Sequence, residues 1–250
     1  MDTTRLTKAQ VKWVRSLQNK KVRDELGLFV AEGQKCVSEL QDAFQLELLI
    51  TPDNASPAEI EQMSSLRTPQ GIIGVFRKQR NTLPPDAPYA IPTDGNNALV
   101  LALDGIQDPG NLGTIIRTCD WFGVHHIFCS HDTADCFNPK VVQATMGALA
   151  RVQVHYTDLL PLLQSYCQAH IPVYGTLLDG RDMYASGTIQ DKQRGLIVMG
   201  NEGNGLSADV RTRITHPLYI PRYPHDAKTS ESLNVSIATA IVLAEFRRPV

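Results

Sequence analysis

Apolar positions in the first eighty residues follow two spacings. Four of them recur at the interval of a helix face: Leu6, Val11, Val14 and Leu17. This stripe predicts an amphipathic helix over Leu6–Lys20. Short apolar runs predict strands at 28–31, 46–50 and 72–76, and the stretches 33–43 and 57–65 predict helices between them. The pattern therefore predicts a small domain of alternating helices and strands.

A proline-rich stretch interrupts this pattern. Four prolines fall between residues 83 and 95. Segments of this composition act as semi-rigid spacers more readily than as packed elements. We therefore predict a first domain at residues 1–80, a linker at 81–97 and a second domain at 98–250.

From Ala98 onward, apolar runs alternate with helical patterns. The runs predict strands at 98–103, 126–129, 152–155, 173–178 and 196–199, and the helices lie near 111–122, 138–149 and 157–170. Strands that alternate with helices of this length are typical of an α/β fold with a mostly parallel sheet. Ligands bind such sheets at the carboxyl ends of the strands. The loops after residues 103, 178 and 199 are therefore the candidates for chemistry.

The composition is that of an ordinary globular protein, with 42% hydrophobic and 20% charged residues in a chain of 250. The first residues lack the apolar core of a signal peptide, and the longest apolar run, 237–244, falls short of the ~20 residues that span a bilayer. Five scattered cysteines, an odd number, favour reduced thiols. These features predict a cytoplasmic protein with no membrane partner.

The charge is unevenly distributed. The net charge of −2 does not favour nucleic-acid binding, but eight basic and only four acidic residues lie between Asp2 and Lys35. A basic segment on an otherwise acidic chain is suited to RNA phosphates. A solvated helix face rich in lysine and arginine explains the same charges equally well.

The first candidate loop follows the strand at 98–103. Gly105 and Gly110 have the spacing of a phosphate loop, but Asn111 stands where such a loop needs lysine, which excludes a Walker motif. Asn111 is predicted to cap the helix that follows, and Arg117 lies six residues further along it. Both side chains could face one cleft. A cap and a surface ion pair would explain the same two residues.

Two further loops combine glycine with polar side chains. Three glycines within residues 200–205 let the backbone pass close to a ligand. Glu202 among them is either a partner for a cation or simply exposed. The glycine spacing does not match the dinucleotide-binding fingerprint. Ser232 and Asn234 stand where a final helix opens, where they either cap the helix or bind a ligand.

Metal and thiol chemistry find little support in the sequence. The cysteines and histidines between residues 119 and 136 lack the spacings of zinc sites. A cysteine nucleophile needs an activating neighbour, and none can be located. We predict no metal.

Together the three loops resemble the signature motifs of the SpoU-type (TrmH-like) RNA 2′-O-ribose methyltransferases, within the SPOUT superfamily. The matching strings occur in the family's order at Asp108–Arg117, at Ile197–Leu206, and at Ile220-Pro221 with Ser232–Ser236. The segments Lys20–Arg23, Phe29–Gly33 and Thr68–Ile72 resemble the RNA substrate-binding domain that many members carry. One departure is the link Arg222–Glu231, which is longer than the family's and leaves the local shape of the cofactor pocket open.

The resemblance implies a fold, a partner and a reaction. The fold is a mostly parallel α/β sheet with a C-terminal trefoil knot, preceded by a small α/β domain like that of certain ribosomal proteins. The implied assembly is a homodimer whose active site lies at the interface. The implied reaction is methylation of a ribose 2′-hydroxyl in structured RNA, with S-adenosylmethionine as cofactor and ribosomal RNA favoured as substrate.

The resemblance also assigns roles to single residues. The implied catalytic residues are Asn111, Arg117, Glu202, Ser232 and Asn234. The implied cofactor contacts are Thr176, Leu177, Gly200, Asn201, Gly203, Ile220 and Leu233, and the candidate RNA contacts are Lys12, Lys20, Lys21 and Arg23. Arg117 is assigned to activation of the hydroxyl. Because a free guanidinium has a pKa above ~12, an unaided arginine is a poor base, and the identity of the proton acceptor stays open.

Three other functions remain as alternatives. The first is a tRNA 2′-O-methyltransferase, and the second is a catalytically silent RNA-binding protein of the same fold. The third is a nucleotide-dependent oxidoreductase, which the missing fingerprint disfavours.

Overall fold

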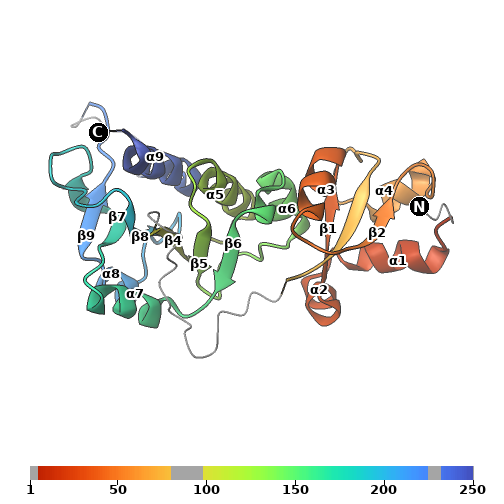
Figure 1. Ribbon diagram of the computed structural model, residues 1–250, viewed down its shortest axis with the longest axis horizontal. Helices are drawn as coiled ribbons and strands as arrows, with labels where there is room; N and C mark the ends of the chain where they lie inside the picture. Colours follow the sequence, from red (N-terminus) through yellow and green to blue (C-terminus); the bar gives the residue numbers. More distant parts are fainter. Residues whose placement is uncertain (1–4, 80–97, 225–231, 250) are drawn as a thin grey trace. The chain divides into compact units, whose positions relative to one another are not determined.

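The computed structural model describes residues 5–79, 98–224 and 232–249 (Figure 1). It consists of two compact units. The first is formed by Met1–Arg80 together with Asp135–Arg151, and the second by Asn81–Ala134 together with Val152–Val250. The predicted linker lies outside the described residues. Within the described part of the chain, no helix has the length and apolar character needed to cross a membrane.

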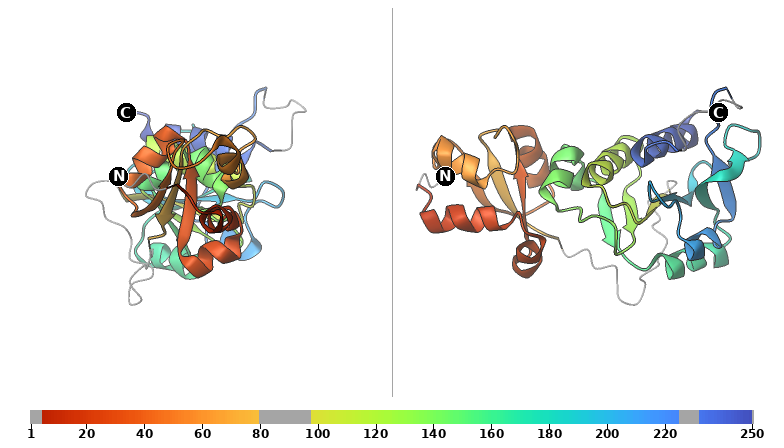
Figure 2. Two further views of the ribbon diagram at one scale, coloured as in Figure 1. Left: turned by 90° about the vertical axis from the view of Figure 1, so that its right-hand side faces the viewer. Right: turned by 180° about the vertical axis from the view of Figure 1, so that it is seen from behind.

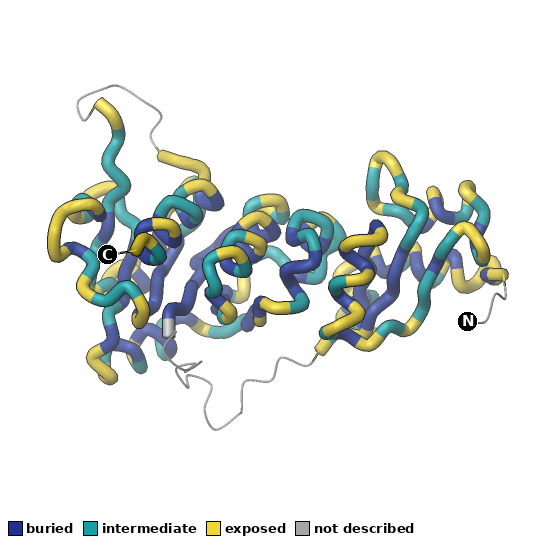
Figure 3. The backbone as a smooth tube through the Cα atoms, turned by 45° about the horizontal axis from the view of Figure 1, so that its top comes forward, coloured by how far each residue is buried: buried dark blue, intermediate teal, exposed yellow. Residues whose placement is uncertain are grey.

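The first unit is a three-stranded antiparallel sheet with helices around it, in the strand order β1-β3-β2. Strands β1 and β3 are buried along almost their whole length, and Figure 3 shows burial along the backbone. Its elements are α1 (Lys8–Ser16), α2 (Lys20–Leu26), β1 (Leu28–Glu32), α3 (Gln34–Gln41), β2 (Leu46–Ile50), α4 (Pro57–Met63), β3 (Ile73–Arg77), α6 (Pro139–Thr145) and the 3-10 helix η1 (Ala148–Ala150).

The predicted helix over Leu6–Lys20 is wrong beyond Ser16. Helix α1 ends there, and the Asn19 side chain then accepts a hydrogen bond from the Lys21 N–H, which caps a second helix, α2. Gly27 ends α2 with a φ of +65°, in the left-handed region that glycine adopts without strain. The asparagine cap is the signal that the hydrophobic pattern could not show.

Residues 135–151 return to the first unit from the second half of the sequence. Phe137 packs on Phe29 with the ring centroids 4.7 Å apart. Asp135 forms an ion pair with Arg23 at 2.7 Å, and the arginine side chain is only 1% exposed. The predicted domain boundaries did not anticipate this return of the chain.

The second unit is a six-stranded sheet in the order β6-β5-β4-β8-β7-β9, and every pairing within it is parallel. This confirms the predicted mostly parallel α/β fold. The elements are β4 (Ala98–Asp104), α5 (Pro109–Trp121), β5 (His126–Cys129), β6 (Gln153–Tyr156), α7 (Leu159–Gln168), β7 (Val173–Asp182), β8 (Arg194–Gly200), α8 (Ala208–Arg211), β9 (His216–Tyr219) and α9 (Val235–Arg247). The predicted knot stays a prediction, because residues 225–231 lie outside the described residues.

Helices cover both faces of this sheet. Figures 1 and 2 show α5 and α9 side by side on one face and α7 with α8 on the other. Apolar residues of α7, among them Leu162 and Tyr166, pack on Val100 and Val198 of the central strands. The register places Asp104 beside Gly200, so the loops that leave β4 and β8 begin next to each other.

Candidate functional site

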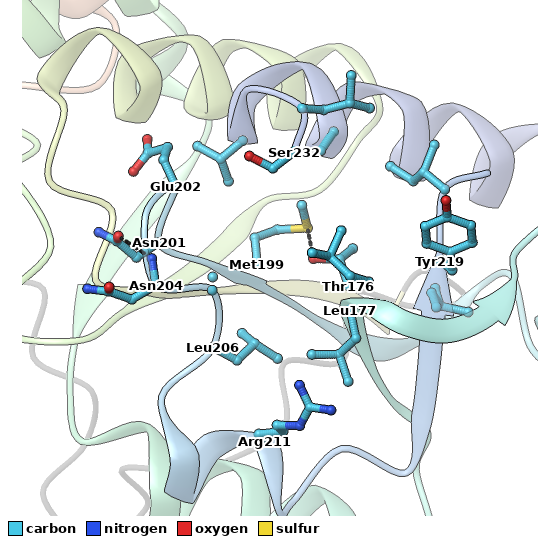
Figure 4. A pocket seen from close by; sticks show the side chains of 18 of the residues that line it. Thr176, Leu177, Met199, Asn201, Glu202, Asn204, Leu206, Arg211, Tyr219 and Ser232 are labelled. Carbon is cyan, nitrogen blue, oxygen red and sulfur yellow. Dashed lines mark hydrogen bonds between the residues drawn. The ribbon is translucent and has the colours of Figure 1, made fainter. Parts of the chain in front are cut away.

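A pocket of about 690 Å³ opens beside the middle of β7 and the carboxyl ends of β8 and β9 (Figure 4). This volume lies within the range of roughly 300–1,000 Å³ that is usual for small-molecule and cofactor sites. The first turn of α9 completes the wall. All seven predicted cofactor contacts line it: Thr176, Leu177, Gly200, Asn201, Gly203, Ile220 and Leu233.

An interruption of strand pairing opens one side of the pocket. Thr176 and Arg181 of β7 both pair with Leu218 of β9, so the residues between them bulge out of the ladder. Gly180 makes the bulge possible, because a Cβ there would lie 2.5 Å from the Leu218 backbone. Leu177 from the bulge lines the pocket.

The glycine loop at 200–205 forms the opposite wall. Asn201 and Gly205 exchange two backbone hydrogen bonds, of 3.0 and 2.9 Å, which close the loop on itself. A Cβ on Gly200 would lie 2.4 Å from the Gly205 carbonyl carbon. Only glycine allows this close approach, so the loop presents backbone atoms to the pocket.

Three predicted catalytic residues form one hydrogen-bonded chain at the rim. The Asn111 side chain donates through Nδ2 to Glu202 Oε1 at 2.6 Å, and its Oδ1 accepts from Asn234 Nδ2 at 2.9 Å. Asn234 Oδ1 caps α9 by accepting from the Ser236 and Ile237 N–H groups. At one end of the chain the Glu202 carboxylate only accepts, and at the other end the backbone N–H groups of α9 only donate. The positions of the oxygen and nitrogen in the Asn111 and Asn234 side-chain amides are therefore fixed.

The cap of α5 differs from the prediction. Asp108, rather than Asn111, is the N-cap, and its Oδ1 accepts from the Asn111 N–H at 2.8 Å. Both residue types cap helices well, so the sequence alone could not choose between them. The consequence is chemical, because the Asn111 side chain is left available for Glu202.

Ser232 and Arg117 complete the predicted catalytic set, in different surroundings. Ser232 lines the pocket. Arg117 is exposed and has no hydrogen bond or ion pair among the described residues. Six residues at 3.6 per turn separate Arg117 from Asn111 by about 240° around the helix axis, so the two side chains do not face one cleft within a single chain.

The candidate RNA contacts divide into exposed and buried residues. Lys12 is exposed, and Lys20 and Lys21 form exposed ion pairs with Asp24 and Glu25. Arg23 is buried and donates to the Leu17 and Gln18 carbonyls as well as to Asp135. A side chain enclosed in this way cannot reach a phosphate, so its prediction as an RNA contact is wrong.

Sequence reasoning missed the residues that hold the loops together. Asp104 Oδ2 accepts the Ser207 N–H at 2.7 Å, which joins the end of β4 to the start of α8. The Thr176 hydroxyl donates to Met199 Sδ at 3.7 Å inside the pocket. Strand ends carry both Asp104 and Met199, which is the signal that could have found them.

The thiols and the histidine pair have structural surroundings. Burial raises the pKa of the Cys36 thiol to about 11 and that of Cys119 further, so neither is a ready nucleophile. His126 Nδ1 and His155 Nε2 lie 3.3 Å apart on neighbouring strands. Burial and the nearby His126 lower the pKa of His155 to about 4. The described residues contain no cluster of three metal-ligating side chains.

Comparison with known protein families gives a match to the part of the chain that forms this site. The SpoU rRNA Methylase family matches residues 98–244, which is the part of the chain that holds the pocket and the polar chain. The protein belongs to this family. An MRM3-like substrate binding domain matches residues 8–65 of the first unit. The family and the domain that the sequence motifs predicted are thereby confirmed.

Relatives match over nearly the whole chain. A 23S rRNA (guanosine(2553)-2′-O)-methyltransferase of Bacillus subtilis is 28% identical, over 95% of this chain and 96% of its own. A solved structure of a TrmH-family RNA methyltransferase described as putative, from Porphyromonas gingivalis, is 37% identical, with a TM-score of 0.81 over 97% and 98% of the two chains. An AdoMet-bound rRNA methyltransferase from Sinorhizobium meliloti is 30% identical, with a TM-score of 0.82 over 98% and 96%.

Proposed function

We propose that this SpoU family member transfers a methyl group from S-adenosylmethionine to a ribose 2′-hydroxyl of ribosomal RNA. The observation that carries the proposal is the pocket with its polar rim. All seven predicted cofactor contacts line the same pocket, and the Glu202, Asn111 and Asn234 side chains form a hydrogen-bonded chain beside it. The names of the Bacillus and Sinorhizobium relatives support ribosomal RNA as substrate.

The pocket residues fit the cofactor. Leu177, Leu206 and Ile220 offer apolar wall for a flat base, while the glycine loop offers backbone polar groups. Glu202 places a carboxylate on the rim, which favours a cationic ligand over an anionic one. Bound here, S-adenosylmethionine would supply an electrophilic methyl group, with its sulfur keeping the electron pair of the carbon–sulfur bond and solvent taking up the hydroxyl proton.

The polar chain positions the rim for the substrate. The Asn234 cap is fixed by the backbone of α9, and it holds Asn111, which in turn holds Glu202. A carboxylate with one oxygen engaged keeps further acceptor sites on its other oxygen. Glu202 therefore orients a hydroxyl donor, and alignment of this kind is a major source of rate for a weak nucleophile.

Arg117 acts at the same site in a homodimer. Its side chain is exposed on α5 and does not line the pocket of its own chain, which leaves it available to the pocket of a second copy. Exposed apolar residues of α5 and α9 suit such an interface: Trp121 is 84% exposed and Ile237 53%. In this proposal Arg117 of one protomer meets the RNA at the pocket of its partner.

The first unit binds the RNA. Lys12, Lys20 and Lys21 supply exposed cations, and surface ion pairs such as those of Lys20 and Lys21 are weak enough to be exchanged for phosphate contacts. We place the protein in the cytoplasm, where thiols such as those of its five scattered cysteines stay reduced.

Methyl transfer from tritiated S-adenosylmethionine tests the proposal. Purified protein should label ribosomal RNA from cells that lack the gene, and nuclease digestion should recover the label as a 2′-O-methylated nucleotide. Label in tRNA alone would replace the proposed substrate with tRNA. No label in either RNA, with no calorimetric heat on adding the cofactor, would reject the function.

A further inference from the structure

The side chain of Asn201 is committed to the protein on both of its polar atoms. Its Oδ1 accepts from the Gly203 N–H at 2.9 Å and from the Asn204 N–H at 3.2 Å. Its Nδ2 donates to the Gly105 carbonyl at 2.7 Å. Both lone pairs of Oδ1 are therefore used, and the amide ties the glycine loop to the loop that leaves β4.

Gly105 is a fixed anchor for this tie. Its own N–H donates to Ser130 Oγ at 2.8 Å, and Ser130 Oγ in turn donates to Asp132 Oδ1 at 2.5 Å. Its φ of +71° and the approach of Asp132 to within 3.1 Å of a would-be Cβ make the position suited to glycine. Gly105 is thus held through its N–H as well as through its carbonyl.

Both partners of the hydrogen bond from the Asn201 side chain to the Gly105 carbonyl lie near residues of the polar chain in the sequence. Asn201 precedes Glu202 in the glycine loop, and Gly105 precedes the turn into α5, which carries Asn111. The bond from Asn201 to Gly105 therefore sets the separation across which Asn111 donates to Glu202 at 2.6 Å.

We propose that Asn201 is a positioning residue for methyl transfer, which acts by holding Glu202 opposite Asn111. This inference rests on the proposed function and gives Asn201 a different task from the cofactor contact that the family motif implied. The backbone of Asn201 still lines the pocket, while its side chain fixes the register between two loops.

The substitution Asn201→Asp separates the two tasks. The aspartate keeps an acceptor for Gly203 and Asn204, and so keeps the loop shape, but it cannot donate to the Gly105 carbonyl. Cofactor affinity should stay within about 3-fold of wild type, whereas the single-turnover rate at saturating cofactor should fall at least about 10-fold, as expected when one partner of an enclosed hydrogen bond is lost.

A double-mutant cycle identifies the residue through which Asn201 acts. In a Glu202→Gln background, Asn201→Asp should lower the rate by less than about 2-fold, because residues in one network are not additive. The matched control is Asn54→Asp in the first unit. Asn54 also donates through Nδ2 to a carbonyl, Leu49 at 2.8 Å, and accepts a backbone N–H, Thr51 at 2.9 Å, so it should lose stability and keep its methyl-transfer rate.

A spectroscopic signature makes the inference independent of activity. In the NMR spectrum of the full chain, the Asn111 side-chain amide should move toward the shifts of an exposed amide in Asn201→Asp and stay in place in Asn54→Asp. If the resonance moves in Asn201→Asp but the wild type transfers no methyl group, the proposed function fails, while the structural part of the inference, that Asn201 holds Glu202 opposite Asn111, stands. An unmoved resonance, additive rates, or lost cofactor affinity with an unchanged rate would overturn the positioning role.

Discussion

At the scale of single residues, Arg117 differs from its predicted partners because no described residue holds it. If it acts on the ribose, Arg117→Ala should leave the melting temperature within about 2 °C of wild type, since exposed substitutions rarely change stability. Its single-turnover methyl transfer should fall by at least ~10²-fold, the low end for a positioned proton-transfer group.

Arg117→Lys should not rescue this loss, because an ammonium cannot reproduce the planar fork of a guanidinium. Melting and turnover are measured on the same preparation. A near-normal rate in folded Arg117→Ala would remove the residue from the catalytic set.

The residues of the site show how far sequence reasoning reaches. The pocket contacts and the Glu202, Asn111 and Asn234 set come from motif resemblance, and the structure gathers them at one place. Arg23 fails because the sign of a charge does not reveal its burial, and its carboxylate partner lies 112 positions away. Long-range pairing of this kind leaves no local pattern.

At the scale of elements, the glycine loop depends on one close approach. Gly200→Ala would force a Cβ to within 2.4 Å of the Gly205 backbone, so the loop must shift. Overpacking of this kind typically costs about 1–3 kcal/mol, and calorimetry should find S-adenosylmethionine affinity reduced at least about 10-fold. Gly203→Ala is the matched change for the stability of the loop, because its Cβ would meet only Asn201 Oδ1, at 3.4 Å, and it should cost less than about 1 kcal/mol of the free energy of unfolding. Equal losses in both variants would contradict the steric account.

His155 on β6, which faces His126 on β5, should make the free energy of unfolding depend on pH. His155 is buried and its pKa is lowered from 6.5 to about 4, so the folded protein keeps it neutral while the unfolded chain protonates it. The stabilisation is therefore complete above pH 6.5 and is lost as the pH falls toward 4.

His155→Phe keeps the stacking on Phe128 and removes the titration. Between pH 7 and pH 5, urea unfolding of the wild type should lose about 2 kcal/mol more than unfolding of the variant. Parallel pH profiles for the two proteins would show that His155 does not carry the dependence.

The elements themselves were largely predictable, and the exceptions have physical causes. Buried parallel strands are continuous apolar runs, so β5 and β8 were found close to their true bounds. Helix α2 was missed because it begins at a cap on Asn19, beyond Leu17, the last residue of the apolar stripe. The extension of β7 to Asp182 was missed because it follows a bulge, which no periodicity records.

At the scale of the whole molecule, the buried pair Arg23–Asp135 secures a distant segment to the first unit. Arg23→Ala leaves the Asp135 carboxylate, only 11% exposed, without its charged partner, and loss of one member of a buried pair costs about 3–5 kcal/mol. The control is Arg77→Ala, which breaks a pair of the same 2.7 Å length to Glu47 on the surface and should cost about 1 kcal/mol or less. Chemical denaturation compares the two, and equal losses would show that burial is not decisive.

Because residues 135–151 belong to the first unit, a single cut or a single graft in the chain does not separate the two units. The chain passes between the units three times, after residues 80, 134 and 151. A backbone break within 81–97 would therefore give two polypeptides that stay associated, since the longer one still contributes Phe137 and Asp135 to the first unit. For the same reason, grafting residues 1–80 onto another methyltransferase would transfer an incomplete unit unless the acceptor also received residues 135–151.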